Sequence, residues 1–257
     1  MKLIDAITFN DELDMLEARI QYLYNAVDFF LIIESNYTHS GNQKPLVLKE
    51  NLSRFSKYSS KMIVRTFAVD SSFDFVDSWK LEVAQRNNIM FNLDEFDAKD
   101  IIMVSDADEI PNKDKIETVR DIVSRQNAVR LNLKMFYYNL TNRLTSYPTW
   151  GASYAATKEF LKANSPNAVR MEHRNIMGID DAGWHLTYFM NANEIKKKIE
   201  SFAHTEFNTP FYTNLERIQK CIDEKIDIYE REDHSFETVN PSSYFPKEFL
   251  KYFSKWA

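Results

Sequence analysis

Three acidic residues follow directly on one short apolar segment. Ile101–Ser105 (IIMVS) runs into Asp106, Asp108 and Glu109, and Pro111 ends the cluster. Residues two apart in an extended segment project to the same side, so the carboxylates of Asp106 and Asp108 lie close together. Like charges at that distance repel unless a cation neutralises them, and a hard divalent ion prefers oxygen ligands. The spacing therefore predicts a Mg²⁺ or Mn²⁺ site at Asp106 and Asp108 that leaves coordination positions for phosphate oxygens.

The same cluster has a structural alternative. Acidic residues favour the first turn of a helix and proline suits its first position, so residues 106–111 also fit a helix start. The apolar segment before the cluster favours ligand binding, because ligands of open parallel sheets bind beyond the carboxyl ends of the strands. A calcium loop of the EF-hand type is excluded, since no glycine occurs in this segment.

A second group of candidate residues lies in the segment DDAGWH, from Asp180 to His185. Gly183 permits a close backbone approach, and the Trp184 ring offers a flat apolar face to a sugar. His185 could complete the shell of a metal or contact a phosphate, and a purely structural role is its alternative. His204 is a further candidate ligand.

Four polar side chains could hold a nucleotide. Glu34 and Ser35 end a second apolar run, and Asn10 ends the first. Their carboxylate, hydroxyl and amide groups can hydrogen-bond a uracil or a ribose diol, although a polar turn or a helix cap uses the same residue types. Arg86 could bind a diphosphate through its planar fork, or it could pair with Glu82 four residues earlier on a helix.

Glycine is scarce, with 4 in 257 residues, and its placement excludes two nucleotide-binding loops. No two glycines are two residues apart, so the dinucleotide motif G-x-G-x-x-G is absent. Gly178 and Gly183 have the spacing of a P-loop, but Trp184 and His185 follow them in place of Lys and Ser or Thr. Any nucleotide must be held by side chains, a metal or non-glycine backbone. The net charge of −6 argues against a general nucleic-acid binder.

Short apolar runs alternate with helical patterns through the N-terminal half. Strands are expected at residues 2–9, 28–33, 61–69 and 101–105. Helices are expected from about residue 13 to 27 and from 75 to 93. Alternation at this spacing predicts an α/β fold with a Rossmann-type, mostly parallel or mixed sheet flanked by helices.

The pattern loosens after Pro111. Strands are expected at 128–140 and 151–157, a loop at 230–243, and helices at 114–125, 192–202, 214–229 and 247–256. Lys196–Lys198 fits a solvated helix face, or attraction to anionic lipid or a phosphorylated acceptor. No composition shift marks a boundary, so we expect a single domain, 1–257, with a nucleotide half at 1–111 and an acceptor half at 112–257.

Three features bear on the cellular location. Acidic residues occur too early in the chain for a signal peptide, and no run of about 18 apolar residues could span a membrane. These features do not exclude peripheral contact with a membrane. Cys221 is the single cysteine, which rules out an intrachain disulfide and suits a reducing compartment. We therefore expect a cytoplasmic protein.

Several segments, taken in order, resemble glycosyltransferase family 17. D-x-D at the end of a strand is typical of GT-A-type glycosyltransferases, and the further stretches make the resemblance specific. They cover roughly residues 5–205 and are FNDELD at 9–14, VDFF at 27–30, ESNYT at 34–38, Gly41 with KPL at 44–46, QRN at 85–87, SDADEIP at 105–111 and AGWH at 182–185.

The resemblance implies a fold, a reaction and a set of roles. It implies a single GT-A-like domain that moves a sugar, with UDP-N-acetylglucosamine (UDP-GlcNAc) as the expected donor, to a glycan hydroxyl with inversion. Asp106, Asp108 and His185 would hold Mn²⁺ or Mg²⁺ on the diphosphate. The nucleotide-sugar would contact six residues: Asn10, Glu34, Ser35, Arg86, Asp106 and Trp184. The resemblance does not itself give the base at Asp181. Asp181 is expected to be the base because it adjoins the segment Gly183–His185 on the acceptor side, and Glu109, which lies in a segment that carries the resemblance, is in reserve. Asp180 and Glu206 are further candidates.

Two other functions fit the same carboxylates. One is a metal-dependent nucleotidyltransferase or phosphohydrolase, for which a glycine-rich triphosphate loop is missing. The other is a carbohydrate-binding or nucleotide-sugar-binding protein without catalysis, against which the intact D-x-D argues.

Overall fold

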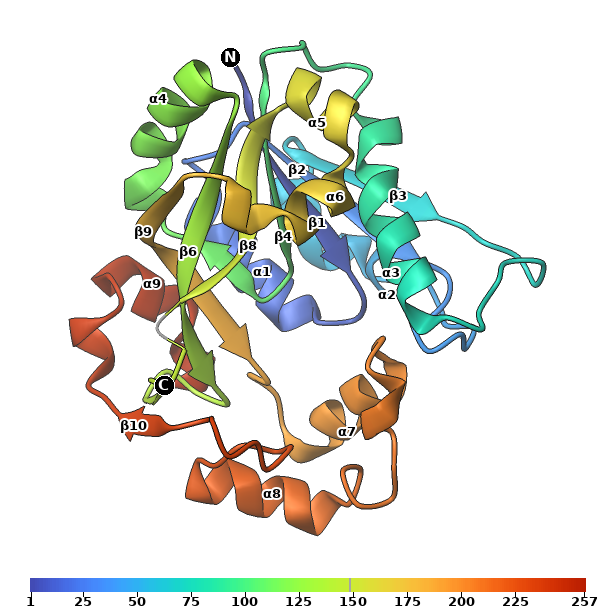
Figure 1. Ribbon diagram of the computed structural model, residues 1–257, viewed down its shortest axis with the longest axis vertical. Coiled ribbons are helices and arrows are strands. Elements are labelled where there is room, and N and C mark those ends of the chain that lie inside the picture. The colour runs from blue at the N-terminus through green and yellow to red at the C-terminus, as the bar shows by residue number, and fades with distance from the viewer. Residues whose placement is uncertain (148) are drawn as a thin grey trace.

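The computed structural model describes residues 1–147 and 149–257, and its strands form one curved mixed sheet (Figure 1). The order along the sheet is β10-β7-β6-β8-β4-β1-β2-β3, and β9 pairs with both β6 and β5. The strands are β1 (Leu3–Phe9), β2 (Phe29–Ser35), β3 (Met62–Phe67), β4 (Ile101–Asp106), β5 (Glu109–Pro111), β6 (Ala128–Tyr137), β7 (Asn142–Leu144), β8 (Trp150–Thr157), β9 (Gly178–Thr187) and β10 (Phe236–Thr238). The expected α/β fold is confirmed.

The N-terminal half of the sheet is parallel. β1 lies between β2 and β4, and β3 adds to the outer side of β2. β1, β2 and β4 are almost wholly buried, as their continuous apolar runs predict for strands that are covered on both faces. Thr8 on β1 lies opposite Asp106 on β4, so the carboxyl ends of these strands meet at one edge.

The C-terminal half turns the sheet antiparallel and then parallel again. β8 pairs antiparallel with β4 and with β6, whereas β9 runs parallel to β6 and antiparallel to β5. The sequence pattern did not predict β9, because exposed polar positions and the left-handed backbone of Asp181 break its apolar run. The expectation of a loop at 230–243 is wrong in part, since β10 pairs there with β7.

Helices cover both faces of the sheet (Figure 1). They are α1 (Leu13–Leu23), α2 (Val47–Glu50), α3 (Ser78–Asn87), α4 (Ile116–Gln126), α5 (Lys158–Asn164), α6 (Pro166–Met171), α7 (Ala192–Ser201), α8 (Leu215–Glu224) and α9 (Lys247–Tyr252). α1, α4 and α9 contribute to the core on one face, and α5 and α6 to the core on the other. α3 is shorter than predicted, because Asp77 accepts a hydrogen bond from the Trp79 amide and caps it there. Among the described residues, no helix combines the length and apolarity needed to cross a membrane.

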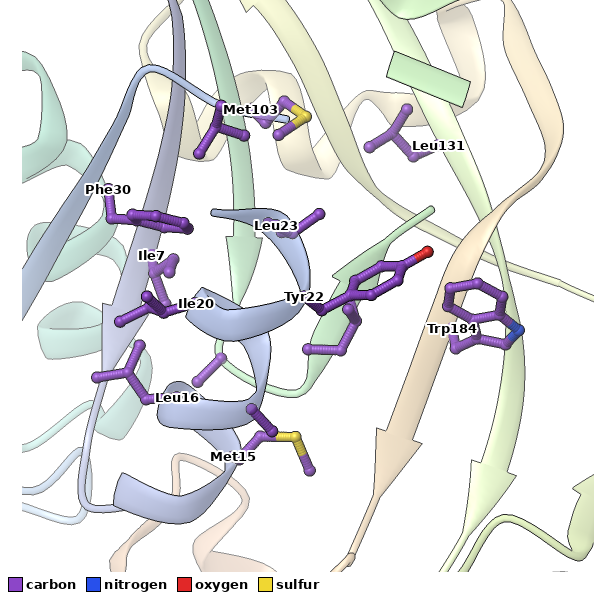
Figure 2. Close-up of a cluster of buried hydrophobic side chains, with 14 of the residues drawn as sticks. Ile7, Met15, Leu16, Ile20, Tyr22, Leu23, Phe30, Met103, Leu131 and Trp184 are labelled. Atoms are coloured by element: carbon purple, nitrogen blue, oxygen red, sulfur yellow. The ribbon is translucent and has the colours of Figure 1, made fainter. Parts of the chain in front are cut away.

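The apolar face of α1 packs on the N-terminal strands (Figure 2). Leu16, Ile20 and Leu23 are fully buried, and burial of each such side chain contributes about 1.5–3 kcal/mol. Tyr22 turns toward Trp184 of β9, with ring centroids 6.2 Å apart. The helix therefore joins the parallel half of the sheet to the C-terminal half, on the side opposite α5 and α6.

Candidate active site

A cleft of about 1210 Å³ opens at the carboxyl ends of β1 and β4 and continues along β6, β8 and β9. Three helices that are far apart in the sequence contribute residues to its walls. α3 and α6 lie near each other, and α7 lies apart from them (Figure 1). All five histidines of the chain line it: His39, His173, His185, His204 and His234.

Asp106 lines the cleft and is held by two guanidinium groups. Its Oδ1 accepts hydrogen bonds from Thr8 Oγ1 at 2.8 Å and Arg86 Nη2 at 3.0 Å, and its Oδ2 accepts one from Arg170 Nη2 at 2.7 Å. Burial alone would raise the pKa of Asp106, but the charges of Arg170 and Arg86 hold it well below its usual range. Asp106 is therefore an ionised carboxylate with both oxygens already occupied.

Glu109 lies beneath Asp106 and is wholly buried. Arg170 donates to both of its oxygens, at 2.9 and 3.0 Å, while Trp150 Nε1 and Ser153 Oγ donate at 2.5 and 2.7 Å. Burial opposes the charge, yet the Arg170 guanidinium lowers the pKa of Glu109 to about 2. Glu109 does not line the cleft. It positions Arg170, and in this geometry it cannot take a proton from a bound acceptor.

Arg19 holds the backbone of the acidic cluster from below. It is fully buried on α1, and its guanidinium donates to both carboxylate oxygens of Asp5 at 2.6 and 2.9 Å. It also donates to Ser105 Oγ at 2.6 Å and to the carbonyl oxygens of Asp106 and Glu109 at 2.8 and 2.9 Å. Sequence reasoning missed this residue, although an arginine on the apolar face of a helix, three residues after Leu16, is a readable signal.

Asp108 faces two groups across the cleft. His185 Nε2 lies 3.6 Å from its Oδ1, and Lys198 Nζ donates to its Oδ2 at 2.9 Å and lies 3.4 Å from Glu12. Burial would lower the pKa of Lys198, but Asp108 and Glu12 raise it, so the ammonium stays charged. The expectation of a solvated face at Lys196–Lys198 is therefore wrong for Lys198, whereas Lys197 is exposed.

Asp108 and His185 fit the first two ligands of a divalent ion. Two ligand atoms about 2.1 Å from a shared ion lie about 3.0–3.6 Å apart, and the Asp108–His185 separation of 3.6 Å is too long for a hydrogen bond. Asp106 does not fit, because guanidinium groups occupy both of its oxygens. Among the described residues, no group of three or more His, Cys, Asp or Glu side chains is placed so that it could hold a metal ion by itself. Substrate and water oxygens would have to complete the shell, as is usual for Mg²⁺.

The family comparison adds to this geometry. The family model of glycosyltransferase family 17 matches residues 1–242. The chain belongs to glycosyltransferase family 17. The chain is therefore a glycosyltransferase, and the family expected from the sequence is confirmed.

Curated relatives of this family 17 chain carry one name. The β-1,4-mannosyl-glycoprotein 4-β-N-acetylglucosaminyltransferases of Rattus norvegicus and Homo sapiens are each 29% identical to it over 121 residues, which is 45% of this chain. The match covers 22% of the rat protein and 23% of the human protein, so the chain spans less than a quarter of the length of these relatives.

Solved structures resemble the chain weakly. S. aureus TarS, residues 1–349, aligns with a TM-score of 0.45 at 9% identity, over 85% of this chain and 69% of that one. The 4-diphosphocytidyl-2C-methyl-D-erythritol synthase aligns with a TM-score of 0.43 at 13% identity, over 69% of this chain and 87% of that one.

Some residues expected at the site of this family 17 enzyme do line the cleft. Asn10 and Arg86 lie in its wall together with Asp106, Asp108 and His185. The alternative role suggested for Arg86, a pair with Glu82 four residues earlier on the helix, is also present. Arg86 Nη2 donates to Glu82 at 2.9 Å as well as to Asp106. The structure thus brings these five predicted residues together, and the further candidate ligand His204 lines the same cleft.

Glu34 and Ser35 lie behind the cleft wall and do not line it. Glu34 is buried and accepts hydrogen bonds from the amides of Leu48 and Lys49 at the start of α2, at 2.9 and 3.2 Å. Ser35 Oγ accepts one from the Tyr37 amide at 3.2 Å. The polar-turn alternative therefore describes both residues, and their expected contact with the nucleotide is corrected.

Trp184 is a core residue and offers no face to a sugar. It packs between Tyr22 and Phe249, and its Nε1 donates to the Tyr244 carbonyl at 3.0 Å. Gly183 beside it allows the close approach that its type suggested, because a Cβ there would lie 2.2 Å from the Ile110 carbonyl oxygen. Trp150, which sequence reasoning did not single out, is the indole that lines the cleft, with its ring 5.1 Å from that of His185.

Asp181 lies outside the cleft. Its carboxylate is exposed and pairs with Lys134 Nζ at 2.5 Å, and that lysine lies over the Tyr244 ring among the C-terminal segments. The hydrogen bond from Lys134 lowers the pKa of Asp181. In this geometry Asp181 cannot reach an acceptor in the cleft, and Asp180 and Glu206 do not line the cleft either.

Asp181→Asn is accordingly expected to keep transfer activity within about twofold of the wild type. The change removes one exposed ion pair, which contributes about 0–1 kcal/mol, and asparagine tolerates the left-handed backbone that Asp181 adopts. Steady-state kinetics of purified variant and wild type measure the effect. A hundredfold loss of kcat with unchanged folding would restore Asp181 as the base.

Proposed function

We propose that this glycosyltransferase moves N-acetylglucosamine from UDP-GlcNAc to a hydroxyl of a glycan. The observation that carries the proposal is the pair Asp106 and Asp108, which stands inside a large cleft at the carboxyl end of a buried parallel strand. The name shared by the curated relatives supports N-acetylglucosamine as the transferred sugar.

The donor lies across the carboxyl ends of the parallel strands in this proposal. Asn10 and His39 flank the uridine end, and the diphosphate lies near Arg86 and Lys198, which supply positive charge without any glycine-rich loop. Residues 1–111 thus form the nucleotide-sugar half, and 112–257 supply Lys198, His185 and the acceptor side.

A divalent ion, Mn²⁺ or Mg²⁺, would be held by Asp108 and His185 when bound. Its chemistry there is to neutralise the negative charge that grows on the departing UDP. Asp106 has a separate task in the proposal. Because it is ionised and fixed by Arg86 and Arg170, it keeps those two guanidinium groups at the wall that faces the diphosphate.

Transfer with inversion needs a base on the face of the sugar opposite the leaving UDP. Within the described part of the chain, five carboxylates line the cleft: Glu12, Glu82, Asp106, Asp108 and Asp233. Asp106 is a poor base, because Arg170 and Arg86 keep its pKa low. Asp108 holds the metal in this proposal, so Glu12, Glu82 and Asp233 are the candidates that replace Asp181 and Glu109.

A donor screen tests the proposal. UDP release is measured for UDP-GlcNAc, UDP-glucose and UDP-galactose, each with Mn²⁺, with Mg²⁺ and with a chelator. We expect UDP-GlcNAc to be consumed at least tenfold faster than the other two UDP-sugars, and only with a divalent ion. Preference for another UDP-sugar would overturn the sugar assignment, and undiminished turnover with chelator would overturn the metal. The anomeric configuration of the product, read by NMR, decides inversion.

A further inference from the structure

Arg130 is a cation of the cleft wall without a counter-ion among the described residues. It is half-buried and lines the cleft, and no carboxylate of residues 1–147 or 149–257 lies within 4.0 Å of it. Its Nε is buried and donates to no acceptor in that part of the chain. Arg86 and Arg170 in the same cleft each hold a carboxylate. A half-buried guanidinium without a partner is costly, so this part of the wall suits an incoming anion.

Two of the four glycines make room for this side chain. A Cβ at Gly178 would lie 2.9 Å from Arg130 Nη2 and 2.7 Å from Asn132 Nδ2, and one at Gly151 would lie 3.0 Å from Arg130 Cδ. The backbone of Gly178 is not left-handed, so glycine is not required there for its conformation. Its lack of a side chain instead leaves room for neighbouring atoms. The guanidinium therefore occupies a place that β8 and β9 leave open for it.

Arg130 lies beyond the part of the cleft that suits UDP. It is on β6, opposite Tyr154 on β8, and Tyr154 lies opposite Val104 on β4. Strands are about 4.8 Å apart, so the Arg130 backbone is about 10 Å from β4 and about 19 Å from β2, where the uridine end is proposed. Arg174, exposed in the short turn that precedes β9, adds a second cation to the lining of the cleft.

We propose that Arg130 is the anion subsite of the acceptor, which carries a carboxylate or phosphate group on a sugar near the hydroxyl that is glycosylated. The inference rests on the proposed function, since it takes the other arm of the cleft as the donor site. The planar fork of arginine matches both anions, each of which accepts two parallel hydrogen bonds. An anionic acceptor would also supply the negative counter-charge that Arg130 lacks among the described residues.

Three sugars that differ only at C6 test the subsite. Wild-type protein saturated with UDP is titrated with glucose, glucuronate and glucose 6-phosphate, and binding is followed by ligand-observed NMR. We expect at least one anionic sugar to bind at least tenfold more tightly than glucose, and the tighter of the two identifies carboxylate or phosphate. Arg130→Met is expected to reduce that preference to less than twofold while UDP affinity stays within twofold. Arg125→Met, on the exposed surface of α4, is the matched control and should keep the preference.

Gly178→Ala is the second variant and retains every charge. Its Cβ would crowd the Asn132 amide as well as the Arg130 guanidinium and displace both, so the preference for the anionic sugar is expected to fall about as far as in Arg130→Met. Equal binding of all three sugars to the UDP-bound wild type would overturn the subsite alone. A more than fivefold loss of UDP or UDP-glucuronate affinity in Arg130→Met would place the contact on the donor and overturn it too. Failure of the wild type to bind UDP would overturn the proposed function and the acceptor assignment with it.

Discussion

Asp108→Asn is expected to lower sugar transfer about 10²–10³-fold and to make UDP affinity independent of Mn²⁺. Loss of one group that stabilises developing charge has an effect of this size. The substitution is expected to disturb little else, because asparagine has the shape of aspartate and Lys198 retains Glu12 as a partner 3.4 Å away. The fold should therefore survive the change.

Calorimetric titration of UDP with and without Mn²⁺, beside steady-state kinetics, measures both effects. Asp121→Asn on the exposed surface of α4 is the matched control and should behave as the wild type. His185→Ala should reproduce the loss of the Mn²⁺ effect if Asp108 and His185 share the ion. If Asp108→Asn retains the full Mn²⁺ dependence of UDP binding, the metal does not lie at this carboxylate.

The sequence predicts the parallel half of the fold closely. β1, β2 and β4 are continuous apolar runs with a helical pattern between them, and local pattern is sufficient there because both strand faces are buried. β9 escapes prediction because its partners β5 and β6 are distant in sequence and its own pattern is irregular. Yet β9 carries His185 into the cleft, so its absence from the prediction matters for the site.

The prediction of the site succeeds for residues whose chemistry is local. The end of a strand predicts Asp106 and Asp108, the helix before that strand predicts Arg86, and all three residues line the cleft. The prediction of site residues fails where the role of a residue depends on which face of its strand points into the cleft. Trp184 and Asp181 lie near His185 in sequence, but in the structure Trp184 points into the core and Asp181 toward Lys134.

Lys198 and Arg170 illustrate the remaining difficulty. Each has an ordinary sequence context, a lysine run and a short polar helix, and each becomes a cleft cation only through pairing with a carboxylate 90 or 64 residues away. No periodicity carries that information. The two aspartates of the D-x-D motif also have different partners: Asp106 binds guanidinium groups, and Asp108 is left for other ligands. This difference likewise arises only in the folded chain.

Arg19→Met is expected to lower the free energy of unfolding by about 3–5 kcal/mol, a large part of the roughly 5–15 kcal/mol typical of a folded protein. The change leaves the Asp5 carboxylate fully buried without its cation, and it removes the donor that serves Ser105 and two carbonyl oxygens of the acidic cluster. Urea denaturation measures the difference. A loss below 1 kcal/mol would mean that Asp5 finds another partner or takes up a proton at little cost.

The double variant Asp5→Asn, Arg19→Met separates stability from the geometry of the site. It contains no unpaired buried charge, so we expect it to regain at least half of the stability that the single variant loses. The carbonyl oxygens of Asp106 and Glu109 remain without their donor, so the segment that carries Asp108 is no longer held in place. We therefore expect kcat to stay at least tenfold below the wild type even where the double variant is fully folded, because small displacements of catalytic groups are costly. Full recovery of kcat together with stability would show that Arg19 serves only to neutralise Asp5.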